Sequence, residues 1–226
     1  MTKSLNILFA VAIALVCTCS ANAQIQSNLV NNAGFEDPLG FDFSDTSNWN
    51  GFFGGPPGTI LEAFNDTGAT PRSGSLALEL TLDGDAGAGV NGFEAFVGHV
   101  QTVAIGGDED FVFSTFARNN SSALTGVTEI RIEFRQGGTE LSRTQIDVES
   151  LLTDSFEEFS IEGTTPTDTD NVNLVFALTS FNQDVLHSNS VVFDDVSFGI
   201  AAIPEPSGVL FATMGLAGLV LRRRRS

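Results

Sequence analysis

The stretch VTEIRIEFR, residues 127–135, alternates charged and apolar side chains from Glu129 onward. The apolar residues share one parity: Ile130, Ile132 and Phe134. The charged residues share the other: Glu129, Arg131, Glu133 and Arg135. Successive side chains of a β-strand point to opposite faces, so this period of two predicts a strand with one buried and one solvated face.

The residues after this stretch predict a hairpin. Gly137 and Gly138 separate it from a second run at 141–148. Adjacent glycines accept positive φ angles at little cost, which is what tight turns between antiparallel strands require. We therefore expect the two runs to be paired neighbours.

Similar short runs recur along the middle of the chain, between turns rich in Gly, Asn and Asp. In LALELTL, residues 76–82, four leucines share one face. Further strands are expected at 96–105, 111–117, 156–162, 172–179 and 190–198. Strands spaced in this way are typical of an all-β sandwich, although the pattern does not define their pairing order.

The region of residues 24–203 is strongly acidic. It contains five arginines and 27 acidic residues, a formal charge of −22. Phosphate binding needs clustered Lys and Arg, so this surface repels nucleic acid and anionic lipid, and nucleic-acid binding is excluded. The 20 Phe and abundant aliphatic residues of the chain are sufficient for an ordinary core.

Residues 1–23 have the three parts of a secretory signal peptide, expected to form a signal helix. The parts are Lys3, an apolar run at 7–16, and Ala21-Asn22-Ala23. We expect cleavage before Gln24. Cleavage would remove Cys17 and Cys19, so the exported protein could form neither a disulfide nor a thiolate site.

Three phrases of the middle region occur in a recognisable order. They are NLVNNAGFED at 28–37, RSGSLALEL at 72–80 and VVFDDVSF at 191–198. Together they resemble carbohydrate-binding modules of the family 4/9/22 type. The resemblance implies that residues 24–199 form one jelly-roll β-sandwich.

The pair Asp194-Asp195 lies within the apolar strand expected at 190–198. Adjacent strand residues point to opposite faces, so one of these carboxylates is expected to face inward, and the sequence does not decide which. A buried carboxylate is costly unless it is hydrogen-bonded, paired or bound to a cation. Arg72 is the main candidate for its partner.

The same resemblance implies a structural calcium ion. Glu36 and Asp194 would provide side-chain oxygens, and the backbone carbonyls of Gly34 and Arg72 would complete the shell. Calcium takes about six to eight oxygen ligands, and its binding energy would add to the folding energy of a domain without disulfides. The alternative is that Glu36 or Asp194 accepts hydrogen bonds from backbone amides or from Arg72.

Candidate sugar-binding residues are few. Carbohydrate modules stack sugars on aromatic rings, and this chain has one Trp and no Tyr. Trp49, in an Asn- and Gly-rich stretch, is interpreted either as a core residue or as a ligand contact. The other candidates, which either line a cleft on a concave sheet or form ordinary surface, are Phe93, Phe96, His99 and Gln101.

Catalytic motifs are missing from the sequence. The only histidines, His99 and His187, are far apart, and neither a G-x-S-x-G nor an H-E-x-x-H motif occurs. Paired carboxylates of a glycoside hydrolase remain a distant alternative. We therefore expect a protein that is not an enzyme.

Residues 200–226 form a tripartite tail. Its parts are Pro204-Glu205-Pro206, an apolar run at 208–221, and the cluster Arg222, Arg223, Arg224 and Arg225. The tail resembles a PEP-CTERM sorting signal, which implies an exosortase-type processing enzyme and release or attachment at the outer surface of a bacterium. The apolar run would form a helix of roughly 21 Å. Because a bilayer core is about 30 Å thick, we expect transient membrane insertion, with a plain membrane anchor as the alternative.

These features predict an exported, non-catalytic protein of the cell surface or extracellular matrix, built on a calcium-stabilised β-sandwich. The alternative function is a polysaccharide-binding module.

Overall fold

The computed structural model describes residues 25–39, 48–55, 60–64, 69–84, 95–121, 124, 126–180 and 187–202. One compact unit spans Ile25–Ala201. The predicted signal helix and the predicted C-terminal helix with its sorting residues lie outside the described residues. In the described part, no helix has the length and apolar character needed to cross a membrane.

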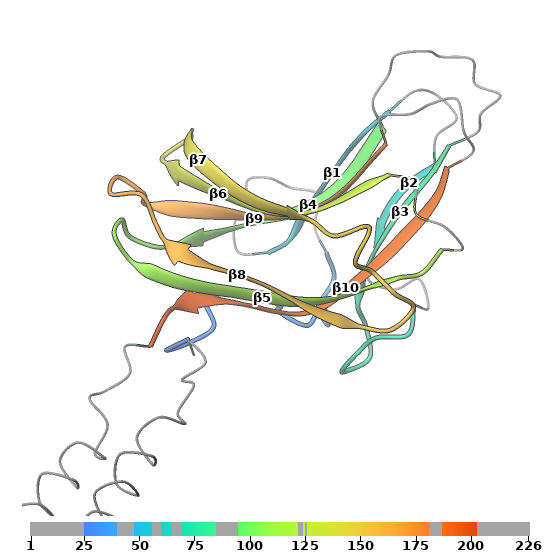
Figure 1. The fold of residues 1–226 in the computed structure, drawn as a ribbon, viewed down its shortest axis with the longest axis horizontal. Helices are drawn as coiled ribbons and strands as arrows, with labels where there is room; N and C mark the ends of the chain where they lie inside the picture. The colour runs from blue at the N-terminus through green and yellow to red at the C-terminus, as the bar shows by residue number, and fades with distance from the viewer. Residues whose placement is uncertain are drawn as a thin grey trace, which may run out of the picture. The chain divides into compact units, whose positions relative to one another are not determined.

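The described part of the chain forms two five-stranded antiparallel sheets (Figure 1). The β9 sheet has the order β1 (Asn50–Gly54), β4 (Ala95–Ala104), β9 (Asn171–Ser180), β6 (Val127–Gln136) and β7 (Thr139–Asp147). The β10 sheet has the order β2 (Ile60–Phe64), β3 (Leu78–Gly84), β10 (His187–Ile200), β5 (Asp110–Asn119) and β8 (Glu157–Thr164). The predicted all-β jelly-roll sandwich is confirmed.

The stretch at 127–135 forms β6 as predicted. Ile130 and Ile132 are completely buried, and β6 pairs with β7 through the Gly137-Gly138 turn. Gly137 has a φ of 56°, in the left-handed region that favours glycine. The predicted hairpin is therefore confirmed.

Two short strands were not expected from the sequence. The segment NGFFG of β1 has the composition of a loop, and ILEAF of β2 is five residues long. Both are defined by pairing with a longer neighbour, β1 with β4 and β2 with β3. Such strands depend on tertiary context more than on local propensity.

Aromatic rings from both sheets meet at Phe176 of β9. The Phe176 ring stacks on Phe193 of β10 with centroids 4.5 Å apart, and lies 5.3 Å from Trp49. All three side chains are fully buried. Burying one large apolar side chain stabilises a fold by about 1.5–3 kcal/mol, so this cluster is a main contact between the sheets.

The two ends of the compact unit lie side by side along β10. Ile25 forms an isolated β-bridge with Ala201, and the Leu29 amide donates to the Phe198 carbonyl at 2.8 Å. A Cβ at Gly199 would lie 2.3 Å from the Ser27 carbonyl oxygen, so the close approach requires glycine.

Candidate functional site

Asp194 is fully buried, and its carboxylate accepts hydrogen bonds from three backbone amides. Its Oδ2 accepts from the amides of Arg72 at 2.8 Å and Ser73 at 3.0 Å, and its Oδ1 accepts from the amide of Asp195 at 2.8 Å. Burial raises the pKa of Asp194 above its ordinary value, an effect that these amides partly offset. Asp194 is thus the inward member of the Asp194-Asp195 pair.

Asp195 turns outward at a β-bulge, with a φ of 50°. Its carboxylate pairs with the Arg72 guanidinium and accepts a hydrogen bond from the Ser73 hydroxyl at 2.6 Å. The Arg72 guanidinium also lies 3.5 Å above the centre of the Phe116 ring. The charge of Arg72 is therefore used by the exposed carboxylate rather than by the buried one.

Glu36 binds the other end of the turn that contains Arg72. Its Oε1 accepts from the amides of Ser75 at 2.8 Å and Leu76 at 3.1 Å. A Cβ at Gly74, which has a φ of 64°, would lie 1.9 Å from this oxygen. The contact of Glu36 with the turn therefore requires glycine at position 74.

The structure brings the four expected calcium-site residues together. A Cβ at Gly34 would lie 3.8 Å from Glu36 Cγ and 4.0 Å from Asp194 Oδ1, so Gly34 lies close to both side chains. Both carboxylates accept hydrogen bonds from backbone amides, as the alternative interpretation expected. Among the described residues, no group of three or more His, Cys, Asp or Glu forms a metal cluster.

Of the candidate sugar-binding residues, Trp49, His99 and Gln101 lie in the interior, with exposures of 0%, 0% and 1%. The Gln101 side chain accepts a hydrogen bond from the Asn31 amide and donates one to the Asn31 carbonyl, each of 2.9 Å. The Trp49 Nε1 donates to the Asn32 carbonyl at 3.3 Å. Phe93 lies outside the described residues.

Phe96 has the opposite parity on β4 and belongs to the solvent side of the β9 sheet. Its ring lies 6.3 Å from that of Phe52 on β1, and both rings are partly exposed. A Cβ at Gly98 would lie 2.4 Å from the Phe52 ring, so the missing side chain leaves room for it. The two rings form an aromatic pair at one side of this face.

The solvent side of the β9 sheet, here called the outer face, continues from the aromatic pair through an apolar floor to a polar network. The floor consists of Val175 and Ala177 on β9, which are buried although they lie on the solvent side. In the register of the sheet, Ala177 pairs with Gly98 on one side and Glu129 on the other. Val175 likewise pairs with Val100 and Arg131.

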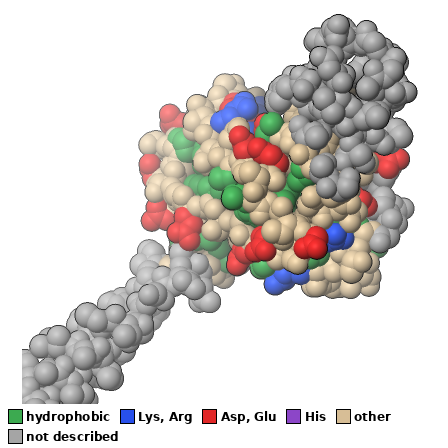
Figure 2. All heavy atoms as spheres, turned by 45° about the vertical axis from the view of Figure 1, so that its right-hand side comes forward, with side chains coloured by type: hydrophobic (Ala, Val, Ile, Leu, Met, Phe, Trp, Pro, Cys, Tyr) green, Lys and Arg blue, Asp and Glu red, His purple; other side chains and the backbone are tan. Residues whose placement is uncertain are grey.

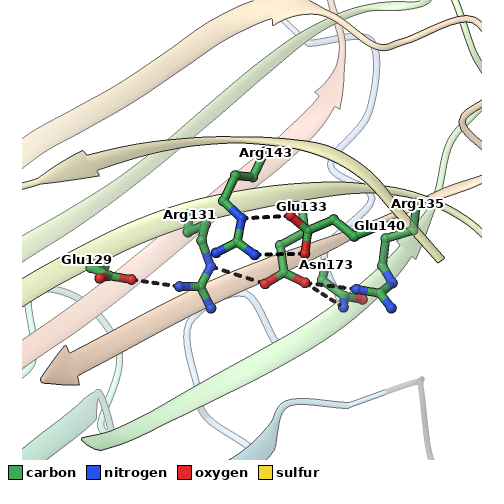
Figure 3. A network of polar contacts seen from close by, with 7 residues as sticks. All are labelled: Glu129, Arg131, Glu133, Arg135, Glu140, Arg143 and Asn173. Carbon is green, nitrogen blue, oxygen red and sulfur yellow. Dashed lines mark hydrogen bonds and ion pairs between the residues drawn. The ribbon is translucent and has the colours of Figure 1, made fainter. Parts of the chain in front are cut away.

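The polar network is centred on Glu133 of β6 (Figure 3). Its carboxylate accepts from Arg131 Nε at 3.1 Å, Arg135 Nη1 at 3.1 Å and Asn173 Nδ2 at 3.2 Å. The Asn173 side chain also accepts from the Thr102 hydroxyl at 2.8 Å, which extends the network to β4.

Two further ion pairs flank this centre. Arg131 Nη1 donates to Glu129 Oε2 at 2.7 Å. On the edge strand β7, the Arg143 guanidinium donates twice to Glu140, at 2.6 and 2.9 Å. The hydrogen bond from Arg143 lowers the pKa of Glu140 below its ordinary value, so this carboxylate is ionised near neutral pH.

The sequence analysis assigned Glu129, Arg131, Glu133 and Arg135 to the solvent face but not to a site. The signal that could have identified the site is complementarity across the predicted hairpin, which places Glu140 and Arg143 beside a strand of alternating charge. An aromatic pair and planar polar groups on one face of a sheet are an arrangement suited to sugars, which present CH faces and hydroxyl groups.

No family model matches the chain, and neither does any curated protein. Solved structures do match. The enzymatically active domain of tailspike protein 4 from bacteriophage CBA120 aligns with 76% of this chain and 21% of its own, at 18% identity and a TM-score of 0.52. A structure described as the carbohydrate-binding module CBM4 aligns with 76% of this chain and 99% of its own, at 16% identity and a TM-score of 0.50.

This chain has the jelly-roll fold of a carbohydrate-binding module. The likeness is one of fold, since a ligand cannot be inferred from 16% identity. The match spans about a fifth of the tailspike chain, 21%, and so the enzymatic activity of that protein does not transfer.

Proposed function

We propose that this is an exported, non-catalytic surface or matrix protein whose sandwich binds a polysaccharide on the outer face of the β9 sheet. The observation that carries this proposal is the presence on one sheet face of the Phe52–Phe96 pair and, across the Val175–Ala177 floor, the network of Arg131, Glu133 and Asn173. The jelly-roll fold, shared with a carbohydrate-binding module, supports it.

The aromatic pair supplies the apolar part of a sugar site. The CH face of a pyranose stacks on aromatic rings, and partly exposed rings that need no rearrangement pay little entropy on binding. A sugar lying on Phe52 and Phe96 would extend over the Val175–Ala177 floor towards β6.

The polar network supplies hydrogen bonds to hydroxyl groups. Hydrogen bonds orient both side chains: Asn173 bonds to Thr102 and Glu133, and Glu133 also accepts from Arg135. Side chains that are already oriented lose less conformational entropy when a ligand binds. This network is therefore better suited to recognition than isolated surface residues.

The test is affinity electrophoresis of the mature, exported chain through gels that contain neutral polysaccharides. Phe96→Ala should weaken retention, whereas Phe156→Ala should not, because Phe156 lies near β8 of the other sheet against Arg118. Equal retention of all three proteins in every gel would contradict the outer face as the binding site. Release of reducing sugar from the same polysaccharides would instead favour the hydrolase alternative.

The proposed sorting route rests on the sequence of the tail. Pro204-Glu205-Pro206 would mark the region of cleavage by an exosortase-type enzyme, after transient insertion of the apolar run at 208–221. Mass spectrometry of the surface-exposed protein tests this. A mature protein that retains Arg222–Ser226 would instead indicate a plain membrane anchor.

A calcium ion between Glu36 and Asp194 is part of the proposal. The residues suit a hard cation in one respect: within the described residues, neither carboxylate forms an ion pair, although Asp194 is fully buried. A divalent ion would supply the missing positive charge, with the carbonyls of Gly34 and Arg72 as further oxygen ligands. The ion would stabilise the fold and would not take part in binding sugar.

A further inference from the structure

The three arginines of the outer face are all engaged by glutamates of the same face. Arg131 pairs with Glu129 and Glu133, Arg135 pairs with Glu133, and Arg143 pairs with Glu140. The face therefore contains cationic groups without being cationic.

We infer that Glu129, Glu133 and Glu140 determine the ligand class of this face, by occupying its guanidinium groups and restricting it to uncharged glycans. This inference rests on the proposed function. Glu140 is the residue on which the restriction can be tested most directly.

An anionic sugar would have to displace a glutamate from its arginine. The displaced carboxylate would stay on the same face, close to the incoming anion, and like charges at short range repel. The surroundings add to this effect, because acidic side chains are spread over the described surface in Figure 2 while basic ones are few. Binding of a uronic acid or sulfated sugar would therefore form one ion pair with an arginine, break the arginine–glutamate pair of the protein, and take place in a repulsive field.

An uncharged sugar meets no such obstacle. A guanidinium has five N–H donors, and Arg143 gives two of its hydrogen bonds to Glu140. The remaining donors can still reach sugar hydroxyls, and those hydroxyls can donate to carboxylate oxygens in turn. The outer face thus offers guanidinium donors and carboxylate acceptors to an uncharged sugar without breaking its ion pairs.

Glu140 is separable from the rest of the network. The Glu140–Arg143 pair lies on the edge strand β7 and is made within that strand, whereas the hydrogen bonds of Glu133 come from Arg131, Arg135 and Asn173. The two side chains are 28% and 47% exposed, more than the other pairs of the face. Removing the charge of Glu140 would therefore free a cation that a polymer can reach.

The experiment compares hydroxyethyl cellulose with carboxymethyl cellulose, two soluble forms of one glucan that differ in charge. Affinity electrophoresis of the mature chain should show retention of the wild type by the neutral polymer only. Glu140→Gln should gain affinity for the carboxymethylated polymer by up to about fivefold, the size expected of one exposed ion pair. High salt should remove the gain, because exposed charges are screened.

Two variants make the result decisive. Glu162→Gln removes the same charge from the exposed side of β8 in the other sheet, and should not change retention by either polymer. The double variant Glu140→Gln, Arg143→Gln also lacks the Glu140 carboxylate but has no freed guanidinium, so it should not gain affinity for the carboxymethylated polymer. Thermal melts followed by circular dichroism verify that each variant is folded.

The outcomes separate the two proposals. A wild type that binds the carboxymethylated polymer as tightly as the neutral one overturns the charge restriction and leaves polysaccharide binding intact. A gain that is equal in Glu140→Gln and Glu162→Gln also overturns it. Retention of no variant by any polysaccharide overturns the proposed function itself, and the restriction with it.

Discussion

The backbone amide of Arg72 donates a hydrogen bond of 2.8 Å to the carboxylate of Asp194, 122 residues further along the chain. Ser73 donates to the same oxygen, so one buried side chain of β10 fixes the turn before β3. Glu36 fixes the far end of that turn through Ser75 and Leu76. The first, middle and last parts of the described domain are therefore joined by carboxylate-to-amide hydrogen bonds.

Asp194→Ala should destabilise the domain by about 3 kcal/mol, because three part-buried amides lose their shared acceptor. Asp195→Asn is the matched control at the next residue. It removes an ion pair between partly exposed groups, which is worth up to about 1 kcal/mol. Urea denaturation measures both free energies of unfolding. Equal losses for the two variants would contradict the inward and outward assignments.

Calcium should raise the melting temperature relative to EGTA if the ion binds at Glu36 and Asp194. Burial raises the pKa of Asp194 above its ordinary value of 3.8. As the pH falls, Asp194 therefore becomes protonated before the pH reaches 3.8, and the effect of calcium on the melting temperature should weaken in the same range. Asp194→Asn should reduce the difference between calcium and EGTA. Superimposable melts of the wild type with and without EGTA would remove calcium from the proposal.

Gly98→Ala should destabilise the domain and disturb the aromatic pair. The added Cβ would lie 2.3 Å from the Phe176 carbonyl oxygen and 2.4 Å from the Phe52 ring. The backbone oxygen cannot move away without distorting β9, and overpacking of this kind costs about 1–3 kcal/mol. Gly138→Ala is the control, since its Cβ would meet nothing within 4 Å. Thermal melts should separate the two variants, and similar melting temperatures would contradict the close packing.

The strands could largely be predicted from the sequence, because period-two alternation reports burial directly. Ile130, Ile132 and Phe134 lie inward as their parity predicted. β1 escaped prediction because NGFFG has loop composition and becomes a strand only by pairing with β4. Strand order escaped as well, apart from the β6–β7 hairpin, since ladders such as β4–β9 and β3–β10 join segments distant in the sequence.

The site was harder to predict because β4 carries apolar and polar residues on both faces. Val97, His99 and Gln101 face the core, while Phe96 and Thr102 belong to the solvent side. Gln101 is tolerated inside because Asn31 satisfies its amide, a contact 70 residues away that local sequence does not show. The residues of the metal hypothesis, in contrast, came together because their motif order reflects the fold.

Gln101→Ala should lower stability without changing polysaccharide affinity. The substitution leaves the amide and the carbonyl of Asn31 without their partner, at a cost of about 1–3 kcal/mol. Gln101 faces the core, so no ligand on the outer face contacts it. Denaturation and affinity electrophoresis on one preparation measure both effects. Weakened retention by a folded Gln101→Ala protein would show that the inner residues of β4 take part in binding.

The Glu140–Arg143 pair should make a pH-dependent contribution to stability. Arg143 lowers the pKa of Glu140 in the folded protein below the value of 4.5 expected in the unfolded chain. Over the window between these two values the unfolded state binds more protons, so the contribution is complete above pH 4.5 and is lost as the pH falls through the folded value.

The melting temperature of Glu140→Gln should therefore lie below that of the wild type at pH 7, and the gap should close in acid. The gap is small, about 3 °C or less, because both side chains are substantially exposed and screened by solvent. Glu162→Gln, whose carboxylate lies on β8, provides the reference for loss of a charge alone. A gap that persists unchanged from neutral pH to well below 4.5 would mean that the carboxylate of Glu140 does not stabilise the fold through its ionised form.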